Sequence, residues 1–306
     1  MTGSPLFWLV LALSLPVSPS VRLSAQQVSD SGFRPTVSSP AFATGRGPAV
    51  LLDEAHFNFH TTTGRYLAFV RLVEHDGFVV RANHSPFSAA ALKDARILVI
   101  ANALADTGEW VLPARPAFTS AEVAAVREWV RGGGSLLLIA DHMPFPGAAE
   151  SLAQTFGVEF SNGFAMDSTG REGMAVFRRR EGTLAPHPIT DGRAGGERID
   201  SVRSFTGQAF RLTGPGTPLL TLDSSFVNFL PARAWEFSAA TQRHSAKGML
   251  QGAAIDYGRG RMAVFGEAAM FSAQLSGPQR LPMGMNRPDA PQNAQFALNV
   301  MRWLAQ

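Results

Sequence analysis

The stretch V-L-L-D-E-A-H-F-N-F-H-T-T-T, Val50–Thr63, decides how this chain is expected to fold. It continues an apolar run, Ala49–Leu52, that stops at an acidic pair. Three ligand-type side chains then follow at every second position: His56, Asn58 and His60. An open α/β sheet binds its ligands beyond the carboxyl ends of its parallel strands. We therefore predict a strand here whose end contributes polar groups to a site.

Four apolar segments are typical of a parallel sheet. The predicted strands are Ala49–Leu52, Phe78–Val80, Ile97–Ile100 and Leu136–Ala140. Helical periodicity separates them, and one helix is predicted to start at a capping box from Thr119 to Glu122. Strands without polar alternation indicate a sheet covered by helices on both faces. We expect a flavodoxin-like three-layer α/β sandwich with a mostly parallel sheet.

The second half of the chain changes in character. Residues from about 160 to 245 lose helical periodicity and are rich in Gly, Arg, Thr and Pro. This composition predicts a β-rich insertion or an antiparallel extension of the sheet. Met249–Tyr257 and Arg261–Phe265 flank a short connection typical of a hairpin, and a helix over Asn293–Leu304 closes the chain. We expect a single domain over residues 48–306.

The N-terminal residues indicate export. Pro5–Leu15 is an apolar run, shorter than the roughly 20 residues that span a bilayer but typical of a signal-peptide core. Residues 1–25 are therefore predicted to be a signal peptide, and residues 26–47, rich in Ser, Pro and Gly, a flexible leader. We expect a periplasmic or secreted protein with no further transmembrane segment. An uncleaved anchor is the alternative, because no Lys or Arg precedes the run.

Composition excludes several classes of function. The 306 residues carry a net charge of only +3, and Arg178–Arg180 is the only basic run. A nucleic-acid surface shows more clustering of basic residues, so no nucleic-acid partner is expected. There is no cysteine, which removes disulfides, thiolate metal ligands and thiol nucleophiles. The oligomeric state stays open.

Polar residues follow the predicted strands, and right-handed crossovers would gather them along one edge of the sheet. The candidate ligand-binding residues are His56, Asn58, His60, Asn102, Asp141, His142 and Glu267. In one interpretation His56 and His60, completed by Asp141 or Glu267, hold a divalent metal that polarises water for hydrolysis. The sequence suggests no other cofactor. In a second, Asp141, His142 and Glu267 act as acid and base without a metal. In a third, Asp53, Glu54 and the His residues cap helices and satisfy loop backbone in a binding or structural domain.

Four short motifs carry a resemblance to a known superfamily. They are D-E-A-H-F-N-F-H at Asp53–His60, G-G-G-S-L-L-L-I-A-D-H at Gly132–His142, H-P-I-T-D-G at His187–Gly192 and G-R-M-A-V-F-G-E at Gly260–Glu267. The pattern resembles the class I glutamine amidotransferase-like superfamily. Within it, the chain is most similar to domains of unknown function that also occur in gliding-motility-type ABC transporter auxiliary proteins. The resemblance implies a flavodoxin-like fold and a site at the strand ends.

The chain departs from that superfamily at the nucleophile. Amidotransferases place a catalytic Cys on a sharp turn after a central strand, where this chain has Ala140-Asp141-His142-Met143. Glutamine hydrolysis through a thioester is therefore excluded. We expect binding of a small-molecule or carbohydrate-like ligand, and Trp110 and Trp235 lie in loop-like sequence where a sugar platform could form. The alternative is a metal-assisted or carboxylate-dependent hydrolase that uses the cluster of His56, His60, Asp141, His142 and Glu267. Whether the protein is an enzyme stays open.

Overall fold

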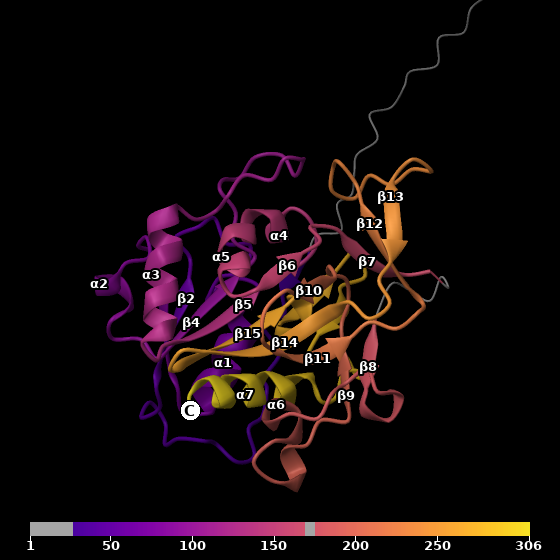
Figure 1. Ribbon diagram of the computed structural model, residues 1–306. Helices are drawn as coiled ribbons and strands as arrows, with labels where there is room; N and C mark the ends of the chain where they lie inside the picture. The colour runs from indigo at the N-terminus through magenta and orange to yellow at the C-terminus, as the bar shows by residue number, and fades with distance from the viewer. Residues whose placement is uncertain (1–26, 169–174) are drawn as a thin grey trace, which may run out of the picture.

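A computed structural model describes residues 27–168 and 175–306, so the predicted signal peptide lies outside the described residues. The central sheet has nine strands (Figure 1). They are β2 (Ala49–Asp53), β3 (Val79–Asn83), β4 (Ile97–Ala101), β5 (Ser135–Ile139), β6 (Val158–Phe160), β10 (Phe210–Leu212), β11 (Thr217–Thr221), β14 (Leu250–Tyr257) and β15 (Gly260–Phe265). Their order is β3-β2-β4-β5-β15-β14-β10-β6, and β11 also pairs with β14.

The sheet is mixed, which corrects the expectation of a mostly parallel one. β3, β2, β4, β5 and β15 form a parallel block, whereas β14, β10, β11 and β6 are joined by antiparallel pairings. Only Gly258 and Arg259 connect β14 to β15, and so short a connection permits only antiparallel neighbours. β6, β10 and β11 then extend the sheet beyond β14.

Helices cover both faces of the parallel block. They are α1 (Leu67–His75), α2 (Ala89–Leu92), α3 (Ser120–Arg131), α4 (Phe145–Ala148), α5 (Glu150–Thr155), α6 (Pro188–Asp191) and α7 (Asn293–Leu304). Successive side chains of a strand point to opposite faces, so β5 contributes to two cores. Leu137 and Ile139 belong to the core that includes α1 and α7, and Leu136 and Leu138 to the core that includes α3 and α5.

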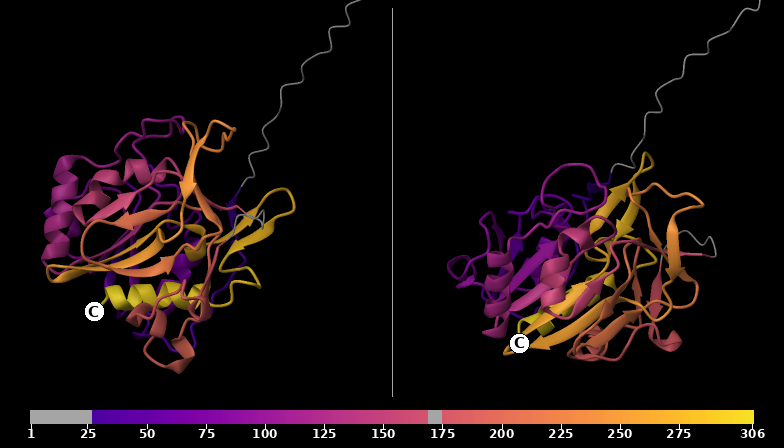
Figure 2. Two further views of the ribbon diagram at one scale, coloured as in Figure 1. Left: turned by 45° about the vertical axis from the view of Figure 1, so that its right-hand side comes forward. Right: turned by 45° about the horizontal axis from the view of Figure 1, so that its top comes forward.

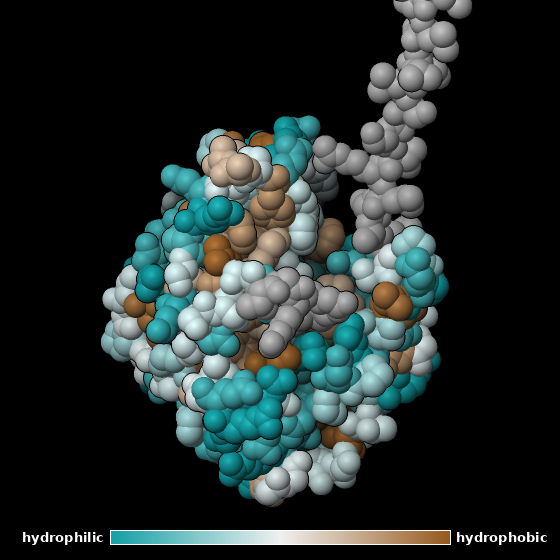
Figure 3. All heavy atoms as spheres, turned by 90° about the vertical axis from the view of Figure 1, so that its right-hand side faces the viewer, coloured by the Kyte–Doolittle hydropathy of each residue, from teal (hydrophilic) through white to brown (hydrophobic). Residues whose placement is uncertain are grey.

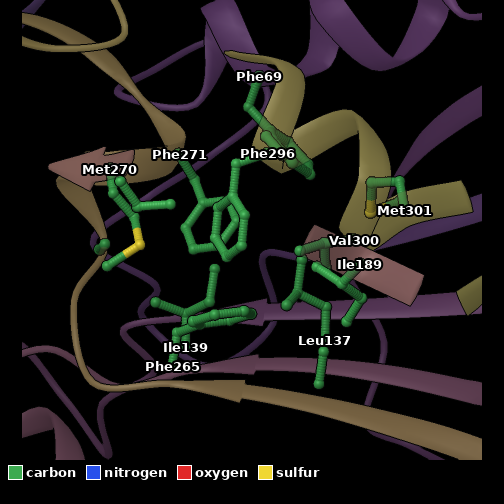
Figure 4. Close-up of a cluster of buried hydrophobic side chains, with 14 of the residues drawn as sticks. Phe69, Leu137, Ile139, Ile189, Phe265, Met270, Phe271, Phe296, Val300 and Met301 are labelled. Carbon is green, nitrogen blue, oxygen red and sulfur yellow. The ribbon is translucent and has the colours of Figure 1, made fainter. Parts of the chain in front are cut away.

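Aromatic rings fill the core between the sheet and α7. The ring centre of Phe265 lies 4.9 Å from that of Phe271 and 5.6 Å from that of Phe296 (Figure 4). Burying one such side chain contributes about 1.5–3 kcal/mol relative to leaving it exposed. Phe271 follows β15 closely in the chain, so this packing also fixes the loop at the carboxyl end of that strand.

Smaller sheets flank the central one. Their strands are β1 (Val28–Ser29), β7 (Phe164–Asp167), β8 (Val176–Arg178), β9 (Ser201–Arg203), β12 (Phe226–Leu230), β13 (Gln242–Ser245), β16 (Ala273–Ser276) and β17 (Leu281–Gly284). The sheets are β1-β16-β17, β13-β12-β7 and β8-β9. β12 and β13 form an arm beside β7, at one end of the molecule (Figures 1 and 2). Within the described residues, no helix combines the length and the apolar character needed to cross a bilayer.

The segment expected to be a flexible leader, residues 26–47, lies instead on the domain over its described part. β1 pairs antiparallel with β16. The Ala41 backbone N–H donates a hydrogen bond to the buried Asp76 carboxylate at 2.8 Å. Composition misleads here, because a segment that pairs with an existing strand needs no amphipathic periodicity of its own.

Candidate functional site

His56 lies between two carboxylates. Its Nδ1 is 2.8 Å from Asp53 Oδ2, and its Nε2 is 2.8 Å from Glu122 Oε1. The buried ring also packs against the rings of Phe87 and Phe118, at 4.6 and 4.8 Å between centres. Burial opposes the charged ring, but the hydrogen bonds and charges of Asp53 and Glu122 outweigh it and raise the pKa of His56. This histidine is therefore held as a cation.

The residues around His56 are linked by hydrogen bonds. We call Asp53, His56, Asn58, Asn83 and Glu122 the His56 cluster. Asp53 also accepts hydrogen bonds from the amides of Asn58 and Asn83, at 3.0 and 3.4 Å. Glu122 is the predicted capping-box residue of α3, and the box is confirmed. Its carboxylate also accepts from the Phe87 N–H at 3.1 Å. With these partners in place, the cluster fixes the loops after β2 and β3 rather than presenting free ligands.

A separate group of the predicted residues surrounds a cavity of about 30 Å³, which we call the strand-end cavity. The predicted residues that line it are His60, Asn102, Asp141 and His142. Its other lining residues come from several loops and from the β1-β16-β17 sheet: Gln27, Phe59, Phe145, Thr206, Trp235, Ala269, Gln274 and Met283. The sequence predicts one shared site at this edge of the sheet, but the structure has two separate regions there, the His56 cluster and the strand-end cavity.

Asn102 sets the hydrogen-bond roles in the cavity. It follows β4 with a positive φ of 52°, a conformation that Asn adopts more readily than most residues. Its Oδ1 accepts from the Asp141 N–H at 2.9 Å, so its Nδ2 donates to His60 Nδ1 at 3.3 Å. His60 then carries its proton on Nε2. Burial, followed by the charges of Arg65 and His142, holds the pKa of His60 well below its usual value, so the ring is neutral.

His142 is held by its backbone neighbour and by aromatic rings. Its Nδ1 is 2.8 Å from the Met143 carbonyl oxygen. Because a carbonyl only accepts, Nδ1 carries the proton, and the neutral form of the ring has an acceptor at Nε2. The ring stacks on Phe164 at 4.6 Å and meets Trp235 edge to face at 4.6 Å. The Asp141 carboxylate accepts from the His142 N–H at 2.7 Å.

Glu267 does not line the cavity, although the sequence predicts it as a ligand. The residue is fully buried, and its two oxygens accept from the N–H groups of Ala269 and Met270 at 2.6 and 2.8 Å. Burial first, and then the charge of Asp141, raise the pKa of Glu267 well above its usual value. Its observed contacts position the loop that contains Ala269, a cavity residue.

His60 and Asp141 line one cavity, but the predicted metal ligands do not form a group of three among the described residues. In residues 27–168 and 175–306, no three acidic, histidine or cysteine side chains form a group that could hold a metal ion. Both nitrogens of His56 are bonded to carboxylates, while the ring of His60 packs against Tyr66 at 4.6 Å. Although His56 and His60 belong to one run of alternating polar residues, the first ring lies in the His56 cluster and the second lines the strand-end cavity.

Sequence reasoning does not single out Gln274, because β16 is not among the predicted strands. Gln274 is 1% exposed, and its Nε2 donates to the Ser272 hydroxyl at 2.7 Å. Its Oε1 is buried and has no hydrogen-bond partner within residues 27–168 and 175–306. Trp235 has a clearer signal, since its loop-like sequence context marks it as a potential platform. In the structure it is 50% exposed with a φ of 67°.

The fold is shared with a solved domain. The mmIFT52 N-terminal domain superposes with a TM-score of 0.59 at 15% identity, covering 84% of this chain and 97% of that domain. A protein described as ThuA-like from Parabacteroides merdae gives 0.48 at 13% identity, over 85% of this chain and 91% of that one. Another so described, from Bacteroides uniformis, gives 0.45 at 13% identity, over 88% and 94%. The sequence matches no protein-family model and no curated protein sequence. The first similarity shows a common fold alone, that of the mmIFT52 N-terminal domain.

Proposed function

We propose that the chain is an exported, amidotransferase-like domain that lacks the Cys nucleophile and binds a small polar, carbohydrate-like ligand at the strand-end cavity. Numbered along the chain, the five parallel strands have the spatial order second, first, third, fourth, fifth. That is the order of flavodoxin-like sheets, whose ligands bind between the first and third strands. His60 follows the first of these strands and Asn102 the third, which supports both the flavodoxin-like assignment and the site.

One observation carries the proposal: polar side chains with fixed hydrogen-bond roles line the same cavity as the exposed Trp235. The cavity of about 30 Å³ holds about one water-sized group, so the rest of a ligand would remain at its rim. Trp235 at the rim is 50% exposed, and Phe237, whose ring packs on Phe164, is 40% exposed. Aromatic faces of this kind suit the apolar face of a sugar ring.

The backbone at Trp235 supports the same reading. Bulky residues with positive φ are uncommon and cluster at ligand clamps. The Ala234 N–H donates to the Trp110 carbonyl at 2.9 Å, which ties the two tryptophan-bearing loops together. Hydrophobic residues gather in the upper part of the face that Figure 3 shows, at the level of the β12–β13 arm. An exposed apolar group rimmed by polar residues is typical of a binding surface.

Trp235→Ala tests the proposal. In calorimetric titrations with a panel of mono- and oligosaccharides, we expect at least one sugar to bind the wild type, and this variant to bind it at least tenfold more weakly. Phe57→Ala is the matched control, because Phe57 is also an exposed aromatic with positive φ but belongs to the loop of the His56 cluster. Failure of the whole panel to bind the wild type, or equal losses in both variants, would contradict the proposal.

A carboxylate-dependent hydrolase is the second candidate, and one observation favours it. Asp141 and His142 both line the cavity, and His142 Nε2 has no hydrogen-bond partner among the described residues. An imidazole nitrogen placed in this way could accept a proton from water. Nitrophenyl glycosides would report such activity, and His142→Gln should abolish it while keeping the ring's volume approximately. Turnover that survives this change would exclude His142 as the base.

A further inference from the structure

Gln274 lines the strand-end cavity, and its side chain has a buried acceptor with no hydrogen-bond partner among the described residues. The Ser272 hydroxyl donates to the Ala269 carbonyl at 3.1 Å, so it can only accept from the amide of Gln274. This fixes the amide with Nε2 toward Ser272 and leaves Oε1 as the buried oxygen without a partner. Leaving such an acceptor unpaired costs about 1–3 kcal/mol. A donor on the ligand would recover part of that cost.

The rest of the lining is also rich in acceptors. Asp141 contributes a carboxylate, and His142 contributes Nε2. Among the described residues, no Lys or Arg lines the cavity. Arg65, the cation that acts on His60, instead lies over the Phe59 ring at 3.7 Å and donates to the Phe59 carbonyl. Burial and the nearby charge of Asp141 raise the pKa of Glu267 well above its usual value, and Glu267 is not a lining residue.

Aromatic rings complete the walls. Phe59, Phe145 and Trp235 all line the cavity. The negative face of an aromatic ring attracts a cation, and several rings around one small space form the kind of cage that binds ammonium groups. A carboxylate in the same wall adds to this attraction. Both features favour a positively charged head group over a neutral one.

We infer that the group that enters the strand-end cavity is a primary ammonium, so the ligand is an amino sugar or a comparable small amine. Its three N–H donors match three acceptors: Gln274 Oε1, Asp141 and His142 Nε2. A hydroxyl has one donor and would leave two of these acceptors unsatisfied. The Nε2–H of His60 remains available to an oxygen beside the amine. This inference rests on the proposed function.

The test compares three sugars of one size: D-glucosamine, D-glucose and N-acetyl-D-glucosamine. In calorimetry at a pH where the amine is charged, D-glucosamine should bind the wild type at least tenfold more tightly than the other two. Its affinity should fall as the amine loses its proton. Gln274→Met should remove most of the advantage that D-glucosamine has over D-glucose. Gln279→Met is the matched control, because Gln279 is exposed in the turn between β16 and β17.

The outcomes separate this inference from the proposed function. Suppose that D-glucosamine and D-glucose bind with equal affinity and that Trp235→Ala loses both. This result would contradict the inference of a bound ammonium group and would still support a sugar-binding site. A D-glucosamine advantage that persists in Gln274→Met would overturn the placement of the head group against Gln274. No binding of these sugars or of the wider panel to the wild type would overturn the proposed function as well.

Discussion

The His56 cluster and the strand-end cavity both lie at the carboxyl ends of the parallel strands, yet they differ in how their polar atoms are satisfied. In the cluster, both nitrogens of His56 meet carboxylates. Of the residues that line the cavity, Gln274 has an Oε1 without a partner in the part of the chain that the structure describes, and Trp235 is half exposed. Complete bonding makes the first region a fixed part of the scaffold. Incomplete bonding makes the second a candidate for ligand binding.

The two regions also shift the pKa of their histidines in opposite directions. Carboxylate partners raise the pKa of His56 despite its burial. His60 has an amide partner instead, and burial together with the charges of Arg65 and His142 lowers its pKa. The positions are four residues apart in the sequence. What separates them is the charge of the groups that each ring meets, and most of those groups come from elsewhere in the chain.

Asp53→Asn is expected to give the largest difference between the regions. Removing one partner of a buried charge pair typically costs about 3–5 kcal/mol, and Asp53 is fully buried with four hydrogen-bond donors around it. Asp141→Asn should cost less than about 1.5 kcal/mol, because it also relieves repulsion with Glu267. Urea unfolding measures both. Similar losses in the two variants would break the distinction between scaffold and cavity.

Titration of the two histidines should give an effect of intermediate size. The raised pKa of His56 stabilises the fold below pH 6.5, its usual value, and this contribution is lost as pH rises through the folded-state pKa. The lowered pKa of His60 has the opposite effect and destabilises the fold as pH falls below 6.5. In that range the unfolded chain binds a proton at this histidine more readily than the folded chain does.

NMR of the ring protons should therefore show His56 and His60 titrating on opposite sides of pH 6.5. As a control, His60→Gln should reduce the loss of stability toward acidic pH and leave the response near neutral pH in place. Rings that titrate together would show that the two environments are not electrostatically distinct.

Gln274→Met is expected to have the smallest effect on stability. It loses one hydrogen bond to Ser272 but also removes the unpaired oxygen, and these contributions are each about 1 kcal/mol and opposite in sign. The free energy of unfolding should change by less than about 1 kcal/mol in urea titrations. A loss of several kcal/mol would mean that Gln274 belongs to the scaffold, as Asp53 does.

Much of the fold could be predicted from local patterns. The capping box at Thr119 and the helix over Asn293–Leu304 agree with the structure at the residue level. Both depend on interactions within a few residues of the chain. The mixed character of the sheet could not be predicted in the same way, because it depends on which strands pair with β14 across distant parts of the sequence.

The candidate site was likewise predicted only in part from the sequence. Polar residues after apolar strands marked His60, Asn102, Asp141 and His142, which do line one cavity. The same signal marked His56 and Glu267, whose bonding partners are complete. Residue type and strand ends alone do not distinguish these cases. The distinguishing contacts come from Glu122 in one case and from backbone N–H groups after β15 in the other.

The sequence by itself determined the strands, the helices that separate them and the edge at which polar groups gather, because periodicity and capping act over short distances. Only the tertiary structure decided which of those groups are bonded and which are free. It carried Gln274 on β16, next to β1, to the cavity wall and placed Trp235 over His142. Hydrogen-bond satisfaction depends on partners that folding brings together, and the local pattern does not encode those partners.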